Sequence, residues 1–252
     1  MKNSKKINEH ASKKVASFKH WYHRITISSG IETPGSHDSN QELALLDQLG
    51  LPLDCSGLRV LDIGCCDGFF SFEMERRGAD VLAIDFTAPG IRGFSIAAEL
   101  LNSNVEHRIA NVYDLNPAEF GTFDMVLFLG VLYHLRNPLL ALDKVRSVTK
   151  SEGLLFVETQ LATDVTVLES DTPLCQFFPA DTLYGDGTNK WGPNQAGLVE
   201  MVREAQFELV NEGRYGDRGY AYAKSIYDEK LESFRKIDSS TSAFGAEQKN
   251  KT

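Results

Sequence analysis

The chain has 252 residues, of which 42% are hydrophobic and 24% are charged, the composition of a globular protein. Its four cysteines form no CxxC pair, and no cluster of His, Asp and Glu has ligand spacing, which argues against a disulfide framework and a metal site. Residues 1–20 lack the apolar core of a secretory signal, and no apolar run reaches the ~18 residues that span a membrane. We therefore expect a cytoplasmic protein without a metal; the sequence leaves the oligomeric state open.

Charge is unevenly distributed along the chain. Residues 1–24 contain seven lysines and arginines against Glu9 alone, a local net charge of +6, so the remaining residues contribute −15 to the overall net charge of −9. An acidic body repels phosphate, whereas a basic segment attracts it. The basic start is equally compatible with a solvated, partly disordered segment.

Apolar strand-like runs alternate with amphipathic segments, which is the pattern of an α/β sheet. The first helix is predicted to begin at Ser39, because Ser39 and Glu42 have capping-box spacing, and to end before Gly50. Later helices are predicted over residues 69–77, after Asn137-Pro138 with Leu139, Leu142, Val145 and Val148 inward, and after a capping Asn194. Strands are predicted over residues 59–63, 81–84, 107–110, 125–129, 154–157, 207–210 and 220–223.

These elements predict a doubly wound, Rossmann-like α/β fold with a seven-stranded sheet, mostly parallel with one antiparallel strand near the edge. Residues 160–193 have little periodicity and follow the fifth strand, where long irregular segments usually cover a site. Trp191 and Tyr184 lie in this segment, and they either line an acceptor pocket or pack in the core.

The turn after the first strand of the sheet is the most informative segment. Residues 60–68 (VLDIGCCDG) end a strand, make a tight glycine turn and open a helix, so a ligand can approach the backbone there. The dinucleotide fingerprint GxGxxG does not fit, because Gly64 and Gly68 are four residues apart with Cys66 between them. The turn resembles motif one of the class I S-adenosylmethionine (SAM) methyltransferases, in which the position of Cys66 is often glycine. The resemblance implies that Asp62, Gly64, Cys65 and Gly68 bind SAM.

Further positions extend this resemblance along the chain. Asp85 ends the second strand, 21 residues after Gly64, where an acid can accept both ribose hydroxyl protons. Asn111, Val112 and Tyr113 follow the third strand, where the family contacts the adenine edge, and Phe123-Asp124 opens the fourth. The resemblance therefore adds to the SAM site Asp85, Phe86, Asn111, Val112, Tyr113, Leu129 and Tyr133.

Two stretches narrow the resemblance. The first is residues 128–134 (FLGVLYH), and the second is residues 21–25 leading to 30–35. Both are similar to the group that includes the tRNA wobble-uridine 5-oxyacetic acid methyltransferases. The similarity runs from about Trp21 to Lys224. In that group SAM, or a carboxylated SAM, alkylates the 5-hydroxyl of a modified uridine. The extra carboxylate needs cations; Arg24 and Arg218 align only approximately, and no lysine aligns clearly.

The tRNA enzymes also carry a long helical region before this block, where about twenty residues precede Trp21 here. We therefore expect plain SAM and methyl transfer.

Four residues are candidates for catalysis. Tyr133, just past the fourth strand, is expected to face the sulfonium with its ring or to hold the acceptor with its hydroxyl; the alternative is a packed aromatic. His134 is a candidate general base or a turn-shaping residue. His23 and Arg24 belong to a segment expected to fold over the site, where they contact the acceptor or a carboxylate, unless they are plain surface residues.

We expect residues 1–40 to form a basic arm and active-site cover, residues 41–228 the SAM-binding domain and residues 229–252 a loose tail. The favoured function is methyl transfer to a hydroxyl of a small organic or sugar-like acceptor. The alternative is a tRNA methyltransferase or carboxymethyltransferase that acts on a wobble uridine through the basic arm. The presence of Asp62, Gly64, Gly68 and Asp85 disfavours a non-catalytic SAM-binding module, and the glycine spacing disfavours a nicotinamide dehydrogenase.

Overall fold

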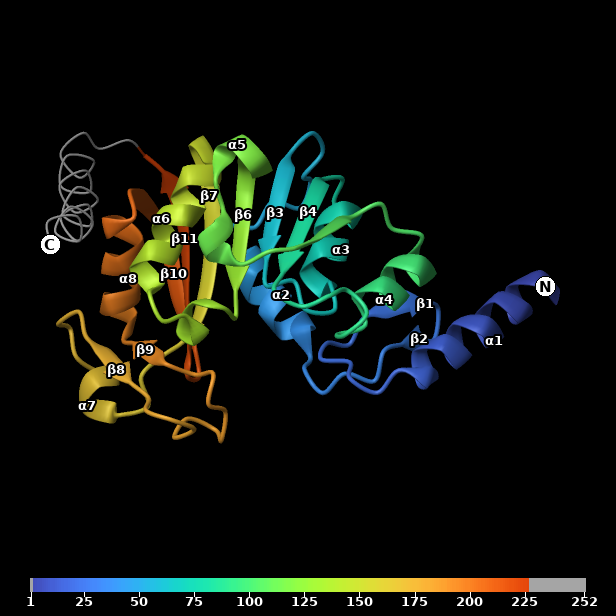
Figure 1. The fold of residues 1–252 in the computed structure, drawn as a ribbon, viewed down its shortest axis with the longest axis horizontal. Helices are drawn as coiled ribbons and strands as arrows, with labels where there is room; N and C mark the ends of the chain where they lie inside the picture. Colours follow the sequence, from blue (N-terminus) through green and yellow to red (C-terminus); the bar gives the residue numbers. More distant parts are fainter. Residues whose placement is uncertain (1, 227–252) are drawn as a thin grey trace, which may run out of the picture.

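A seven-stranded sheet runs through the middle of the molecule in the computed structural model, which describes residues 2–226 (Figure 1). The predicted tail at 229–252 and the last two residues of the predicted 41–228 domain lie outside the described residues. The strands of the sheet are β3 (Arg59–Ile63), β4 (Asp80–Asp85), β5 (Glu106–Ile109), β6 (Phe123–Leu129), β7 (Thr149–Gln160), β10 (Phe207–Tyr215) and β11 (Arg218–Ser225).

The strand order is β10-β11-β7-β6-β3-β4-β5. Strand β11 pairs antiparallel with both β7 and β10, whereas the other pairs of neighbours are parallel. The predicted Rossmann-like sheet, mostly parallel with one antiparallel strand near the edge, is confirmed. The carboxyl ends of β3, β4, β5 and β6 therefore meet at one edge, which is where ligands bind in open α/β sheets.

Helices cover both faces of the sheet. They are α1 (Lys2–Ser17), α2 (Ser39–Leu49), α3 (Phe69–Arg76), α4 (Phe94–Leu101), α6 (Pro138–Val148) and α8 (Gln195–Glu204), with the short α5 (Pro117–Phe120), α7 (Val165–Leu168), η1 (Val112–Asp114) and η2 (Leu132–His134). Because side chains alternate along a strand, Leu61 and Ile63 pack towards α6 and α8, whereas Val60 packs towards α2 and α3. Two small antiparallel pairs lie outside the main sheet: β1 (Thr26–Ser28) with β2 (Ile31–Glu32), and β8 (Cys175–Phe177) with β9 (Trp191–Pro193).

Helix ends and faces differ from the sequence prediction in two places. The N-cap of α2 is Asp38, whose carboxylate accepts from the Asn40 N–H at 3.1 Å, so the prediction of a Ser39 cap is wrong by one residue. In α6 the buried stripe contains Ala141 with Leu142, Val145 and Val148, and Leu139 is 46% exposed because it projects beyond that stripe.

Of the two capping asparagines predicted for the later helices, only one makes a side-chain cap bond. Asn194 caps α8 as predicted, accepting from the Gly197 N–H at 2.8 Å. Asn137 occupies the N-cap position of α6 without a side-chain cap bond; its backbone N–H instead donates to the Tyr113 hydroxyl at 3.0 Å. This bond ties the start of α6 to the segment after β5.

The basic start of the chain forms α1 instead of the partly disordered segment considered from its charge. Ala11 and Val15 are buried against the cluster that contains α4, and the Trp21 indole N–H donates to the Val15 carbonyl at 3.1 Å. Lys14 forms an ion pair with Glu99 of α4. Figure 1 shows α1 at the end of the molecule that carries α4, with α7 and α8 at the opposite end. Among residues 2–226, no helix has both the length and the apolar character needed to cross a bilayer.

Candidate functional site

The turn from β3 into α3 lies at the carboxyl edge of the sheet. Gly64 (φ 76°) and Cys66 (φ 54°) both have left-handed backbone, and the N–H groups of Gly64 and Cys65 donate to the Ile84 carbonyl at 2.8 and 3.1 Å. A Cβ on Gly64 would lie 2.4 Å from the Val131 Cγ2, so this position requires glycine for both conformation and space. The left-handed φ at Cys66 explains why glycine also suits that position.

Asp85 closes the same turn from the end of β4. Its Oδ2 accepts from the Cys66 N–H at 3.1 Å, and its Oδ1 accepts from the N–H and hydroxyl of Thr87, both at 2.8 Å. Two apolar side chains flank the acid: Phe86, which is 72% exposed, and Ile109, its register partner on β5, which is 64% exposed. A carboxylate beside exposed apolar surface fits an adenosine, with ribose hydroxyls on the acid and the base on the apolar side chains.

The segment after β5 is held by its own hydrogen bonds. Asn111 caps η1 by accepting from the Tyr113 N–H at 3.1 Å, and Asp114 completes a capping box. Val112 is buried in the core. The structure places these residues after the β5 strand that pairs with β4, as predicted; their contacts with adenine stay a prediction.

Asp62 lies buried inside β3, two residues before Gly64. The Ser71 hydroxyl of α3 donates to its Oδ2 at 2.5 Å. Burial raises the pKa of Asp62 to about 6, and the bond from Ser71 opposes this rise. The carboxylate is therefore energetically costly to the fold at neutral pH, which suits a residue kept for binding rather than for stability.

The raised pKa predicts a specific pH dependence of stability. Between about pH 4 and pH 6 the folded protein binds more protons at Asp62 than the unfolded chain, so this residue makes the free energy of unfolding fall as pH rises, by about 3 kcal/mol at most. Asp62→Asn removes this contribution. We expect the stability of the variant relative to wild type to increase from pH 4 to pH 7 in urea unfolding; a constant difference over that range would contradict the assignment.

The N-terminal segment is tied to the turn through Asp67. The buried Asp67 accepts from the backbone N–H groups of Tyr22 and His23 at 2.9 and 2.8 Å, and its Oδ1 is hydrogen bonded to the His23 Nδ1. The side chains of His23, Cys66 and Asp67 are of types that bind metals. Their nitrogen, sulfur and oxygen atoms lie within 4.8 Å of one another. Because the direct His23–Asp67 bond and two backbone donors already satisfy the carboxylate, we interpret the cluster as a tether.

The other residue predicted from this segment lies elsewhere. Arg24 is exposed, and its Nε donates to the Gly35 carbonyl at 3.2 Å within the same segment. The structure therefore brings His23 to the turn but not Arg24. Sequence analysis did not single out Asp67, although an acid between two turn glycines is a visible signal.

The carboxyl ends of β6 and β7 and the start of β11 form a polar cluster. The Arg218 guanidinium lies 4.8 Å from the centroid of the Tyr133 ring. Its Nη2 donates to the Glu158 Oε2 at 2.8 Å and its Nε to the Oε1. Glu158 is buried, which raises its pKa, while the Arg218 charge opposes that rise. The Tyr22 ring reaches the same region, where its partial burial and then Tyr133 raise its pKa to about 12.

Sequence analysis named Tyr133 and Arg218 but missed Glu158. In the β11–β7 register Arg218 lies opposite Gln160, so Glu158 is its diagonal neighbour on the same face. An acid inside an otherwise apolar strand was the available signal, but its partner is visible only once the register is known.

The irregular segment after β7 reaches Tyr133 and His134. The Lys190 N–H donates to the Tyr133 carbonyl at 2.8 Å, and the Thr188 hydroxyl is hydrogen bonded to the His134 Nδ1 at 3.0 Å. Tyr184 in this segment donates its hydroxyl proton to Asp217. Trp191 packs on Phe177, with ring centroids 5.0 Å apart. Lining of an acceptor pocket by Tyr184 and Trp191 stays a prediction.

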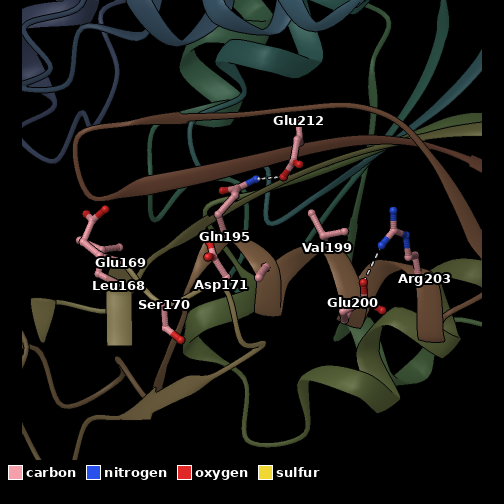
Figure 2. A pocket seen from close by; sticks show the side chains of 10 residues that line it. Leu168, Glu169, Ser170, Asp171, Gln195, Val199, Glu200, Arg203 and Glu212 are labelled. Atoms are coloured by element: carbon pink, nitrogen blue, oxygen red, sulfur yellow. Dashed lines mark hydrogen bonds and ion pairs between the residues drawn. The ribbon is translucent and has the colours of Figure 1, made fainter. Parts of the chain in front are cut away.

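A separate cavity of about 410 Å³ lies between α8, β10 and the segment after α7 (Figure 2). Its lining carries several acids, one of which, Glu200, pairs with Arg203 at 2.5 Å, while Gln195 donates to Glu212 at 2.7 Å. None of the predicted site residues lines this cavity. The cavity lies beside β10, the edge strand at the opposite end of the sheet from β5.

Known proteins resemble the chain in this same region. Residues 61–157 match the family model described as a methyltransferase domain. Ubiquinone biosynthesis O-methyltransferase of Xanthomonas oryzae pv. oryzae (strain PXO99A) is 33% identical over 114 residues, 45% of this chain and 48% of that protein. The tRNA U34 carboxymethyltransferase of Campylobacter hominis is 34% identical over 128 residues, 50% of this chain and 42% of that protein. The chain thus spans about half the length of these curated relatives.

Solved structures extend the likeness to most of the chain. The N-terminal domain of EvdMO1, crystallised with S-adenosylhomocysteine (SAH) and D-fucose, has a TM-score of 0.61 at 20% identity and covers 88% of this chain and 97% of its own. A 1,6-didemethyltoxoflavin-N1-methyltransferase of Burkholderia thailandensis, also with SAH, has a TM-score of 0.56 at 17% identity and covers 75% of this chain and 77% of its own. At these identities the likeness shows the fold.

Proposed function

As residues 61–157 are a class I SAM-dependent methyltransferase domain, we propose that the protein transfers a methyl group from plain SAM to a hydroxyl oxygen of a small organic or sugar-like acceptor. Bound SAM supplies a methyl group on a sulfonium, which is a good leaving group, so alignment carries much of the rate. The proposed SAM site consists of Asp62, Gly64, Cys65, Gly68, Asp85, Phe86, Asn111, Val112, Tyr113, Leu129 and Tyr133.

The ion pair between Arg218 and Glu158 is the observation that favours plain SAM. A carboxylated cofactor needs an uncompensated cation near its extra carboxylate. Arg218 donates to both oxygens of Glu158 through its Nε and Nη2, so its charge is already neutralised by a buried acid. Arg24, the other candidate cation, is exposed and hydrogen bonded to Gly35.

Removing the negative partner should therefore change cofactor preference. In Glu158→Gln the Arg218 charge loses its counterion, and we expect affinity for a carboxylated SAM analogue, relative to SAH, to rise about 10-fold or more, the size of a charge-assisted hydrogen bond. Calorimetric titration measures both affinities. The matched control is Glu152→Gln, because Glu152 is an exposed acid that pairs with Lys224 on β11. If the ratio of the two affinities were unchanged in the Glu158 variant, the proposal that Glu158 neutralises Arg218 against a carboxylated cofactor would be wrong.

The acceptor class is supported by the relatives rather than by a bound molecule. One relative is named for O-methylation in ubiquinone biosynthesis, and the EvdMO1 domain was crystallised with D-fucose. The test is transfer of labelled methyl from SAM to panels of phenols, sugars and tRNA that carries 5-hydroxyuridine at the wobble position. Label in a small hydroxyl compound supports the proposal; label in tRNA alone overturns it in favour of the second candidate.

The second candidate is a tRNA methyltransferase or carboxymethyltransferase that acts on a wobble uridine. It is favoured by the tRNA U34 carboxymethyltransferase relative and by the basic sequence of α1. An RNA substrate would bind more weakly as salt rises, because phosphate contacts release counterions. Little dependence of acceptor binding on salt would support the small molecule.

A further inference from the structure

We propose that Thr188 and Asp186 hold His134 in the neutral Nδ1–H tautomer, which leaves Nε2 as the proton acceptor for the hydroxyl that is methylated. This inference rests on the proposed function and deepens it. It assigns a positioning role to two residues of the irregular segment, and it specifies which nitrogen of His134 acts.

The hydrogen-bond chain sets the tautomer. The Thr188 hydroxyl donates its one proton to the Asp186 Oδ1 at 2.7 Å, and the Thr188 N–H donates to the same oxygen at 2.8 Å. These two bonds hold the pKa of Asp186 below its usual value, so its carboxylate is an acceptor. With its proton committed, the Thr188 oxygen can only accept from His134, 3.0 Å away. The Nδ1 atom must then carry the proton.

A neutral imidazole protonated at Nδ1 has its lone pair at Nε2. Burial is the main reason that the ring stays neutral at pH 7. Burial lowers the pKa of His134, Arg218 on β11 lowers it further, and Asp186 and a backbone bond with Thr188 partly offset these effects. The Tyr133 ring, which lies beside it with centroids 4.0 Å apart, is a neutral neighbour at this pH, because its pKa is raised by burial.

The proton balance of the step follows. The acceptor O–H proton moves to the His134 Nε2, the oxygen electron pair forms the new bond to the methyl carbon, and the carbon–sulfur pair leaves with SAH. His134 then carries a positive charge, which the chain through Thr188 to Asp186 stabilises.

Long-range ¹H–¹⁵N correlation spectra of the full-length, ligand-free protein test the tautomer directly. His134→Gln identifies the His134 signals among the six histidines. We expect wild type above the pKa of His134 to show a protonated Nδ1 and an unprotonated Nε2. Thr188→Val should lose this preference, and Thr188→Ser, which keeps the hydroxyl, should retain it. A protonated Nε2 in wild type, or an unchanged tautomer in Thr188→Val, would overturn the proposal.

Asp186→Asn supplies an independent measurement. Because the Asp186 charge raises the pKa of His134, its removal should lower that pKa in an NMR titration. His107 of β5, which packs on Phe94 of α4, reports whether each variant keeps its fold. An unchanged or higher pKa of His134 would contradict the positioning role. Since neither NMR measurement uses SAM, a failure to bind SAH would defeat the proposed function without affecting the tautomer or the pKa of His134.

Discussion

Replacing Asp85 with alanine is expected to weaken SAH binding about 100-fold or more. In the proposed SAM site this carboxylate accepts two ribose hydroxyl hydrogens, and hydrogen bonds to a charged group are each worth about 1.5–3 kcal/mol. The same carboxylate holds the Cys66 N–H and both donors of Thr87, so the variant also loses part of the order in the turn. Both effects act in one direction, and calorimetric titration with SAH measures their sum.

The matched control is Asp80→Ala. Asp80 begins the same strand, β4, but its side chain is 84% exposed and its nearest ion-pair contact with Arg59 is 3.9 Å long. The control should bind SAH as wild type does. A loss of less than 10-fold in the Asp85 variant, with the control unaffected, would remove Asp85 from the cofactor site.

Asp67→Ala is expected to lower the free energy of unfolding by about 3–5 kcal/mol. The change leaves the N–H groups of Tyr22 and His23 without their acceptor, and unsatisfied buried groups cost about 1–3 kcal/mol each. It also breaks the bond to the His23 ring, so the N-terminal segment loses its tie to the turn. Since the free energy of unfolding of an ordinary domain is about 5–15 kcal/mol, this loss would remove a large part of the stability.

Urea unfolding of Asp67→Ala should be compared with that of Asp54→Ala. Asp54 is an exposed acid that accepts from the Ser56 N–H at 2.9 Å, so we expect its loss to leave the free energy of unfolding close to that of wild type. If the two variants were equally stable, Asp67 would be an ordinary turn residue and the tether interpretation would be wrong.

The β3–α3 turn and Asp85 could be predicted because their signals are local. Strand ends, glycine spacing and an acid at a fixed distance are all visible in a short window, and strands in one parallel sheet bring those ends together. The wrong capping residue of α2 is a small error of the same local kind. Asp38 and Ser39 are both good caps, and the sequence pattern alone does not rank two adjacent candidates.

Contacts between distant segments could not be predicted in the same way. The pairing of Arg218 with Glu158 depends on the β11–β7 register, and the bond between Thr188 and His134 depends on how an irregular segment folds back. No local sequence pattern determines either of these two contacts. The packing of α1 is a third case, because the apolar partners of Ala11 and Val15 include side chains of α4, which is far away in the sequence.

Calorimetric titration of the purified protein with SAH tests most directly whether this chain uses SAM. The glycine turn, the Asp85 carboxylate and the exposed Phe86 predict one site per chain with micromolar affinity, roughly 8 kcal/mol of binding free energy. Absence of binding to a folded protein would contradict the assignment of these residues to a cofactor site, and with it the proposal of methyl transfer.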